Sequence, residues 1–124
     1  MIRGLGIDIV EVDELRRQIE DIAGFLEEVF TVEEIECCKA RPNPYECFAA
    51  RFAAKEAVMK AFGSGWTEEV DFLKISIHSD GDSVPLVKLE PNLQNLLAQY
   101  SASSLKLSMT HTPNYACAVV VLDE

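Results

Sequence analysis

Apolar and polar residues alternate at both ends of the chain, as they do in β-strands with one buried face. One face of the strand predicted over residues 1–10 carries Leu5, Ile7 and Ile9. The opposite face carries Gly4, Gly6, Asp8 and Val10. A second alternation predicts a strand through Leu105, Leu107 and Met109. The last predicted strand, residues 115–122, is almost continuously apolar, so we expect it to be buried on both faces.

Apolar residues at helical spacing predict four helices between residues 13 and 62. The first two carry the apolar sets Leu15, Ile19 and Ile22, and Phe25, Leu26, Val29 and Phe30. Gly24 separates these two helices. Thr31 and Glu34 form a capping-box pattern that begins a third helix, which extends to about Lys39. Asn43 is the predicted N-cap of the long fourth helix, with Pro44 at its first position.

The fourth helix is expected to end near Phe62, followed by Gly63, Ser64 and Gly65. Residues 72–79 and 84–89 are predicted strands joined by a hairpin turn at residues 80–82. An amphipathic helix over residues 91–100 turns Leu93, Leu96 and Leu97 inward. We therefore predict an α+β fold in which an antiparallel sheet packs with one long helix and shorter helices, in a single domain of residues 1–124.

The composition is typical of a small globular domain. The chain has 124 residues and is 48% hydrophobic, which is enough for a core without disulfides or a structural metal. No apolar run approaches the roughly 18 residues of a membrane span, and charges interrupt the N-terminal segment, so we predict a soluble, cytoplasmic protein. The cysteines are Cys37, Cys38, Cys47 and Cys117. They lack Cys-x-x-Cys spacing, so we expect reduced thiols and no zinc site.

Charge is distributed unevenly along the chain. The net charge is −10 and the sequence pI is about 4.6, which disfavours general binding to nucleic acid or anionic membranes. Residues 1–40 hold 11 acidic and 4 basic side chains, a balance of −7. Residues 41–65 hold 4 basic and 2 acidic side chains, a balance of +2, so an anion is expected to bind in that second segment.

Glu56 and Lys60 are the first candidates for chemistry, because four residues of helix place them on one face. Alanines on the same helix leave a narrow surface that can approach a strand closely or admit a ligand. The alternative for the charged pair is an ordinary surface interaction that stabilises the helix by roughly 0.2–0.5 kcal/mol. Asp8 follows Gly4 and Gly6 on its strand face, where it either leaves room for a ligand or caps the next segment.

Asp8 and Glu56 offer the oxygen ligands that Mg²⁺ prefers, together with substrate phosphates and water. Lys60, one turn beyond Glu56, would then contact a phosphate held by that ion. The spacing of these residues does not show that Asp8 meets Glu56, which depends on the fold.

Three motifs make the chain resemble a known family. They are Gly6-Ile7-Asp8-Ile9-Val10-Glu11-Val12, the segment Arg51-Phe52-Ala53-Ala54-Lys55-Glu56-Ala57 with Lys60-Ala61 and Gly63-Ser64-Gly65, and Ser108-Met109-Thr110-His111-Thr112 with Tyr115-Ala116-Cys117-Ala118. In this order they closely resemble holo-[acyl-carrier-protein] synthase, over essentially the whole chain. The length is similar to that of the short phosphopantetheinyl transferases.

The resemblance implies transfer of 4′-phosphopantetheine from coenzyme A to a serine of an apo acyl carrier protein, with release of adenosine 3′,5′-bisphosphate. By position, Asp8 and Glu56 would hold Mg²⁺, and Glu56 would accept the serine proton directly or through a metal-bound water. Lys60 would stabilise charge on the leaving bisphosphate. The residues implied to contact coenzyme A are Arg51, Lys60, Gly63, Ser64, Gly65, His111 and Thr112. The alternative role for His111 is that of a turn residue that hydrogen-bonds within its own loop.

The same resemblance implies a homotrimer with active sites at subunit interfaces. This chain differs from the family pattern at two positions. Glu14 and Glu28 stand where the family typically has arginines that bind an acidic carrier, although Arg16 and Arg17 remain nearby. Like charges repel, so the carrier is expected to be atypical or to dock through those arginines and apolar contacts. Two other functions stay open: a coenzyme A-binding module without catalysis, and a metal-dependent phosphohydrolase.

Overall fold

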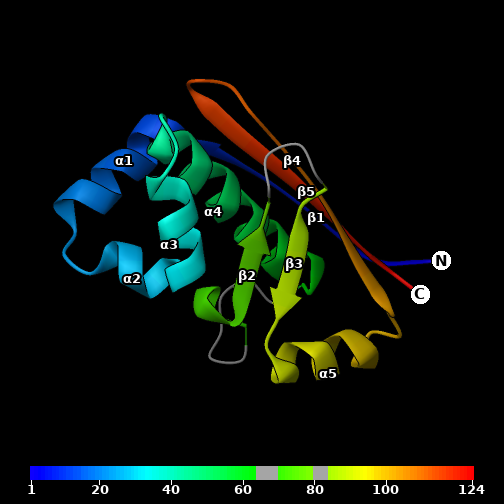
Figure 1. The fold of residues 1–124 in the computed structure, drawn as a ribbon. Helices are drawn as coiled ribbons and strands as arrows, with labels where there is room; N and C mark the ends of the chain where they lie inside the picture. The colour runs from blue at the N-terminus through cyan, green and yellow to red at the C-terminus, as the bar shows by residue number, and fades with distance from the viewer. Residues whose placement is uncertain (64–69, 80–83) are drawn as a thin grey trace.

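The computed structural model describes residues 1–63, 70–79 and 84–124 of the chain. Within these residues the fold is α+β, as predicted (Figure 1). The elements in chain order are β1 (Ile2–Glu11), α1 (Val12–Asp21), α2 (Phe25–Val29), α3 (Val32–Lys39), α4 (Pro44–Ala61), the 3-10 helix η1 (Phe72–Lys74), β2 (Ile75–His78), β3 (Leu86–Leu89), α5 (Pro91–Gln99), β4 (Ser104–His111) and β5 (Tyr115–Asp123). No helix in this described part is long and apolar enough to span a membrane.

The main sheet has the strand order β1-β5-β4, and all its pairings are antiparallel. Asp8 pairs with Ala118 and Ile7 pairs with Val119, so successive residues of β1 face opposite sides of the sheet. The long helix α4 lies along one side of this sheet, and α1 to α3 gather at one end of α4 (Figure 1). The hairpin of β2 and β3 packs beside α4 with α5 below it (Figure 1).

In the part of the chain that the structure describes, no helix or strand covers the other side of the main sheet. On β1, the side chains of Leu5, Ile7 and Ile9 are 61%, 60% and 66% exposed. β5 is not buried on both faces as predicted, because its residues alternate between full and partial burial from Ala116 to Leu122. The prediction was wrong because apolar composition does not reveal that only one face of the central strand meets α4 in this chain.

Glycines bring β1 unusually close to α4. A Cβ atom built on Gly6 would lie 1.9 Å from the carbonyl oxygen of Ala57, and one on Gly4 would lie 2.4 Å from that of Ala61. The alanines from Ala49 to Ala57 are fully buried or nearly so. At Ala57 and Ala61, the narrow surface of the helix therefore accommodates a strand, which is the first of the two predicted alternatives.

Most predicted element boundaries are confirmed. α4 begins at Pro44 with Asn43 in the N-cap position, but the Asn43 side chain makes no capping hydrogen bond. Thr31 and Glu34 form the predicted capping box at the start of α3. The strand predicted from residue 72 begins only at Ile75, because Asp71 caps η1 by accepting a hydrogen bond from Leu73 N. The predicted turn at residues 80–82 lies outside the described residues.

The cysteines differ from the sequence prediction. Cys38 of α3 and Cys47 of α4 are joined by a disulfide, although all four cysteines were expected to be reduced. Their Cα atoms lie 5.4 Å apart, within the distance that a disulfide spans, because α3 and α4 pack against each other on either side of a short connection. The expectation of a free thiol is correct for Cys37 and Cys117.

Candidate active site

The fold brings Asp8, Glu56 and Lys60 together. Asp8 on β1 is 9% exposed, and its Oδ1 atom accepts a hydrogen bond of 3.0 Å from Lys60 Nζ on α4. Lys60 Nζ also donates to the carbonyl oxygen of Ile7 at 3.0 Å. The second carboxylate oxygen of Asp8, Oδ2, is buried and has no hydrogen-bond partner. A buried carboxylate oxygen without a donor is costly unless a cation or a proton satisfies it.

Glu56 stands beside Asp8. Burial, the negative charge of Asp8 and a side-chain hydrogen bond to Asp8 raise the pKa of Glu56 to about 7, while the charge of Lys60 opposes the shift. Two carboxyl groups this close cannot both ionise easily without a cation. At neutral pH, Glu56 is therefore poised to take up or release a proton, which suits a general base.

A pocket of about 250 Å³ opens over these carboxylates. Its lining residues are Asp8, Ile9, Val10, Glu11, Glu14, Leu15, Gln18, Phe52 and Glu56. Within residues 1–63, 70–79 and 84–124, no three His, Cys, Asp or Glu side chains form a group that could hold a metal ion. Asp8 and Glu56 would thus supply two oxygen ligands, and Mg²⁺ commonly takes its other ligands from phosphates and water.

The residues predicted to contact coenzyme A lie in different parts of the structure. Arg51 is buried, and its guanidinium donates to Cys47 Sγ at 2.9 Å and to Cys37 Sγ at 3.4 Å. Burial lowers the pKa of Arg51. Its hydrogen bonds thus go to sulfur atoms of α3 and α4, and its Nε atom is buried without a partner.

His111 lies at the end of β4 beside a second pocket, of about 190 Å³. Its Nε2 atom is 3.6 Å from Glu46 Oε2 of α4. The lining residues of this pocket are Arg41, Pro42, Asn43, Glu46, Cys47 and His111. The predicted basic character of the segment after residue 40 is represented here by Arg41, which the sequence analysis did not single out.

The remaining predicted contacts lie at turns. Thr112 Oγ1 accepts hydrogen bonds from Asn114 N and Tyr115 N, which closes the turn between β4 and β5. Gly63 follows α4 with φ of 73°, a left-handed conformation that glycine adopts without strain. Ser64 and Gly65 lie outside the described residues.

Sequence reasoning missed a buried ion pair next to Glu56. Lys55 Nζ lies 2.6 Å from Glu34 Oε1, and both side chains are fully buried. Burial lowers the pKa of Lys55, and the charge of Glu34 opposes this shift. The capping box identified Glu34 as a local partner of Thr31, but nothing in the sequence links Glu34 to Lys55. Their pairing depends on how α3 packs against α4.

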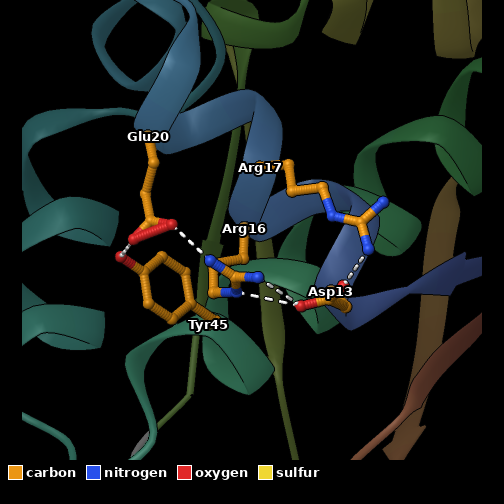
Figure 2. Close-up of polar contacts among 5 residues, drawn as sticks. All are labelled: Asp13, Arg16, Arg17, Glu20 and Tyr45. Atoms are coloured by element: carbon orange, nitrogen blue, oxygen red, sulfur yellow. Dashed lines mark hydrogen bonds and ion pairs between the residues drawn. The ribbon is translucent and has the colours of Figure 1, made fainter.

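The first helix carries its own network of charges. Figure 2 shows Arg16 between Asp13 and Glu20, with Arg17 also directed at Asp13. The hydroxyl of Tyr45 donates to Glu20 at 3.2 Å (Figure 2). The hydrogen bond from Arg16, together with its charge, holds the pKa of Asp13 below its usual range. Both arginines of α1 are therefore engaged with carboxylates of their own helix.

Comparisons with known proteins place the chain in one family. Residues 4–120 match the 4′-phosphopantetheinyl transferase superfamily. The holo-[acyl-carrier-protein] synthase of Halothermothrix orenii is 38% identical over 125 residues, which cover 100% of this chain and 99% of that protein.

Solved structures show the same similarity. The holo-[acyl-carrier-protein] synthase of Neisseria meningitidis has a TM-score of 0.88 and 33% identity, with 100% of both chains covered. The enzyme of Bacillus anthracis, in complex with CoA (3′,5′-ADP), has a TM-score of 0.83 and 32% identity, with 100% of this chain and 98% of that chain covered. The α+β fold is thus that of holo-[acyl-carrier-protein] synthases.

Proposed function

The chain belongs to the 4′-phosphopantetheinyl transferase superfamily, among its holo-[acyl-carrier-protein] synthases, and we propose that it transfers 4′-phosphopantetheine from coenzyme A to a serine of an apo acyl carrier protein. Adenosine 3′,5′-bisphosphate is the other product. Residues 1–124 act as one catalytic domain in this proposal, located in the cytoplasm. The Bacillus anthracis relative in complex with CoA supports coenzyme A as the donor.

The observation that carries the proposal is the cluster of Asp8, Glu56 and Lys60. It combines a carboxyl group with a pKa of about 7, a neighbouring carboxylate and an ammonium within 3.0 Å of that carboxylate. Phosphoryl transfer needs a group to receive the proton of the attacking hydroxyl and positive charge near the phosphate oxygens. Glu56 receives the serine proton, and Lys60 offsets charge on the bisphosphate leaving group.

Asp8 and Glu56 would hold Mg²⁺. The unpartnered Oδ2 atom of Asp8 and the raised pKa of Glu56 support a cation at this position. When bound, the ion would neutralise negative charge on the pyrophosphate of coenzyme A. The Oδ1 atom of Asp8 is paired with Lys60 Nζ at 3.0 Å, so Oδ2 is the oxygen left to contact the ion.

The nucleotide part of coenzyme A would bind beyond this cluster. Arg41 and His111 line the pocket of about 190 Å³ and are the basic groups available there to phosphate oxygens. Thr112 and Gly63 would contact the donor from the turns that follow β4 and α4, together with Ser64 and Gly65. Arg51 would contribute only after exchanging its sulfur contacts for a phosphate.

The uncovered face of the main sheet supports a homotrimer with active sites at the subunit interfaces. Exposed aliphatic side chains of β1 form a continuous surface with half-buried residues of β5, because Ile7 pairs with Val119 and Ile9 with Cys117. A soluble protein rarely leaves a large apolar patch in water without a partner. A second and third copy of this chain would bury it.

The acidic rim of the pocket supports an atypical carrier. Glu14 lines the same pocket as Asp8 and Glu56, while Arg16 and Arg17 are engaged with Asp13 and Glu20 (Figure 2). A carrier with acidic residues beside its serine would meet like charge, which lowers the association rate and the affinity. We propose that basic or apolar residues flank the acceptor serine.

One experiment tests the activity. The protein is incubated with coenzyme A, Mg²⁺ and apo-carriers whose serine is flanked by lysine or by glutamate, and carrier mass and bisphosphate release are followed. Modified carrier with equimolar bisphosphate is expected. Bisphosphate without modified carrier would indicate a phosphohydrolase, and neither product would indicate a coenzyme A-binding module.

The same assay tests the carrier charge. The lysine-flanked carrier should react faster, and added salt should reduce its advantage because surface charges are screened. Glu14→Gln should reduce the difference in modification rate between the two carriers. Glu27→Gln on α2 is the matched control. Faster modification of the glutamate-flanked carrier would reject an atypical partner while leaving the transferase activity intact.

A further inference from the structure

Lys55 and Glu34 form a buried ion pair that the proposed chemistry does not use. The distance from Lys55 Nζ to Glu34 Oε1 is 2.6 Å, and neither side chain is exposed to solvent. Neither residue lines the pocket over Asp8 and Glu56. Lys55 nevertheless directly precedes Glu56 on α4, so anything that orients one side chain constrains the helix that carries the other.

All the hydrogen-bonding capacity of the Lys55 ammonium is used. Besides Glu34, it donates to the carbonyl oxygen of Val29 at 2.8 Å and to that of Phe72 at 3.0 Å. It also lies 5.4 Å from the centroid of the Phe30 ring. An ammonium has three donors, and each has an acceptor here, at the end of α2, at the start of α3 and in η1.

Glu34 is held as fully as its partner. Its Oε1 atom accepts from Thr31 N at 2.8 Å, and its Oε2 atom accepts from Ile77 N of β2 at 2.8 Å. Thr31 Oγ1 in turn lies 2.9 Å from Ser76 Oγ. Through directional hydrogen bonds, the ion pair therefore connects α4 to four other elements, which are α2, α3, η1 and β2.

The opposite constraint on α4 comes from the main sheet. Gly6 allows the backbone at Ala57 to approach β1 so closely that no side chain would fit. Successive residues of a helix are rotated by about 100°, so Glu56 lies between the buried Lys55 on one side and Ala57 on the other. With both neighbours held, the helix cannot rotate about its axis without breaking one of the two contacts.

We propose that the Lys55–Glu34 ion pair is a positioning pair, which sets the rotation of α4 about its axis and thereby directs Glu56 at Asp8. The inference rests on the proposed transferase function. Burying an ion pair is not an efficient way to gain stability, since apolar residues of similar size often serve as well. What an apolar pair lacks is the directional hydrogen bonding that distinguishes one rotation of α4 from another.

The deciding variant is the double substitution Lys55→Met with Glu34→Gln, which removes both charges and keeps an acceptor for Ile77 N. We expect kcat per folded molecule to fall by roughly 10²-fold, the effect of a small misplacement of reacting groups. KM for coenzyme A should stay within about twofold of the parent value, because ground-state binding is not altered. Lys55→Arg, which retains the charge, should have a kcat between those of the parent and the double variant.

Leu93→Ala is the matched control. Leu93 is fully buried in α5, so its truncation lowers the melting temperature and should leave kcat per folded molecule unchanged. Parental kcat in the folded double variant would overturn the inference. If the double variant fails to fold, Lys55→Arg provides the test. A kcat below that of the parent, with unchanged KM, supports the inference, and a kcat equal to that of the parent overturns it. An inactive parent would instead overturn the transferase function, and the inference with it.

Discussion

At the scale of single residues, Glu56 is subject to two opposing influences. Burial and the charge of Asp8 favour its protonated form, whereas Lys60 favours its ionised form, and the result is a pKa of about 7. The Glu56 carboxyl group is therefore able to exchange a proton near neutral pH.

Replacing Glu56 by Gln should abolish carrier modification while leaving the fold intact. The amide cannot accept the serine proton, and general-base contributions are typically 10²- to 10⁴-fold. The free energy of unfolding should not decrease, because the substitution also removes the repulsion between Glu56 and Asp8. Carrier mass spectrometry and urea unfolding measure the two effects, and substantial residual transfer would remove Glu56 from its role.

The raised pKa of Glu56 also predicts how stability depends on pH. The folded state holds this proton up to about pH 7, whereas the unfolded chain releases it near pH 4.5. Between these values the folded state binds more protons, so Glu56 makes the free energy of unfolding fall as pH rises.

The difference in unfolding free energy between the parent and Glu56→Gln isolates this contribution from that of other groups. In metal-free buffer, the parent should lose stability relative to Glu56→Gln as pH rises from about 4.5 to about 7. Parallel pH profiles for the two proteins would show that the pKa of Glu56 is not raised. Added Mg²⁺ should reduce the difference, because a cation favours the ionised carboxyl group.

At the scale of elements, the contact between β1 and α4 decides whether the cluster exists. Asp8 comes from the strand, and Glu56 and Lys60 come from the helix, so their distances depend on how closely the two backbones approach. Gly4 and Gly6 permit that approach. The alanines of α4 complete the contact, which explains a helix surface reduced to methyl groups.

Gly6→Ala should destabilise the fold and reduce transfer together. Its new methyl group would lie 1.9 Å from Ala57 O and 2.8 Å from Ala61 N, so β1 and α4 must separate. Overpacking of this kind typically costs about 1–3 kcal/mol. Gly24→Ala is the control for adding a methyl group, since a Cβ atom on Gly24 would have its nearest neighbour, Glu28 Oε1, 3.8 Å away. The free-energy cost of that variant comes only from the left-handed backbone conformation at Gly24. Equal unfolding free energies for the two variants would contradict the close contact.

The disulfide between α3 and α4 makes a second prediction at this scale. Cys38 and Cys47 are nine residues apart, and a loop of that size is expected to contribute roughly 2–3 kcal/mol by restricting the unfolded chain. Reduction should lower the free energy of unfolding by about that amount. Alkylation of the unfolded, unreduced protein followed by mass measurement should label Cys37 and Cys117 alone. Labelling of all four cysteines would show that the disulfide does not form.

At the scale of the whole molecule, the exposed face of the main sheet points to assembly. If the chain forms the proposed trimer, Ile7→Lys should convert it to monomers, because three lysines would be buried without partners at the interface. Activity should be lost with the trimer if the sites lie between subunits. Leu86→Lys is the control, since Leu86 is 69% exposed on the β3 strand of the second sheet. Light scattering measures the assembly, and a monomeric parent would contradict the proposal.

The sequence by itself determined most elements of this fold, because apolar periodicity, caps and turn residues are local signals. The capping box of α3 and the start of α4 at Pro44 are confirmed to the residue. The prediction of a strand at residues 72–74 was wrong, because a local cap by Asp71 favours the 3-10 helix η1 there. The motifs also identified the family and named Asp8, Glu56 and Lys60 as candidates.

Only the tertiary structure decided which side chains meet. Asp8 and Lys60 are 52 residues apart, and the pairs Glu34–Lys55 and Cys38–Cys47 join different helices, so no local pattern reports their contact. The sequence also left open which face of β1 packs against α4, since alternation distinguishes two faces without saying which of them is buried. Packing made that choice, because only the face with glycines fits against the helix backbone, which turns Asp8 inward and leaves Leu5, Ile7 and Ile9 exposed.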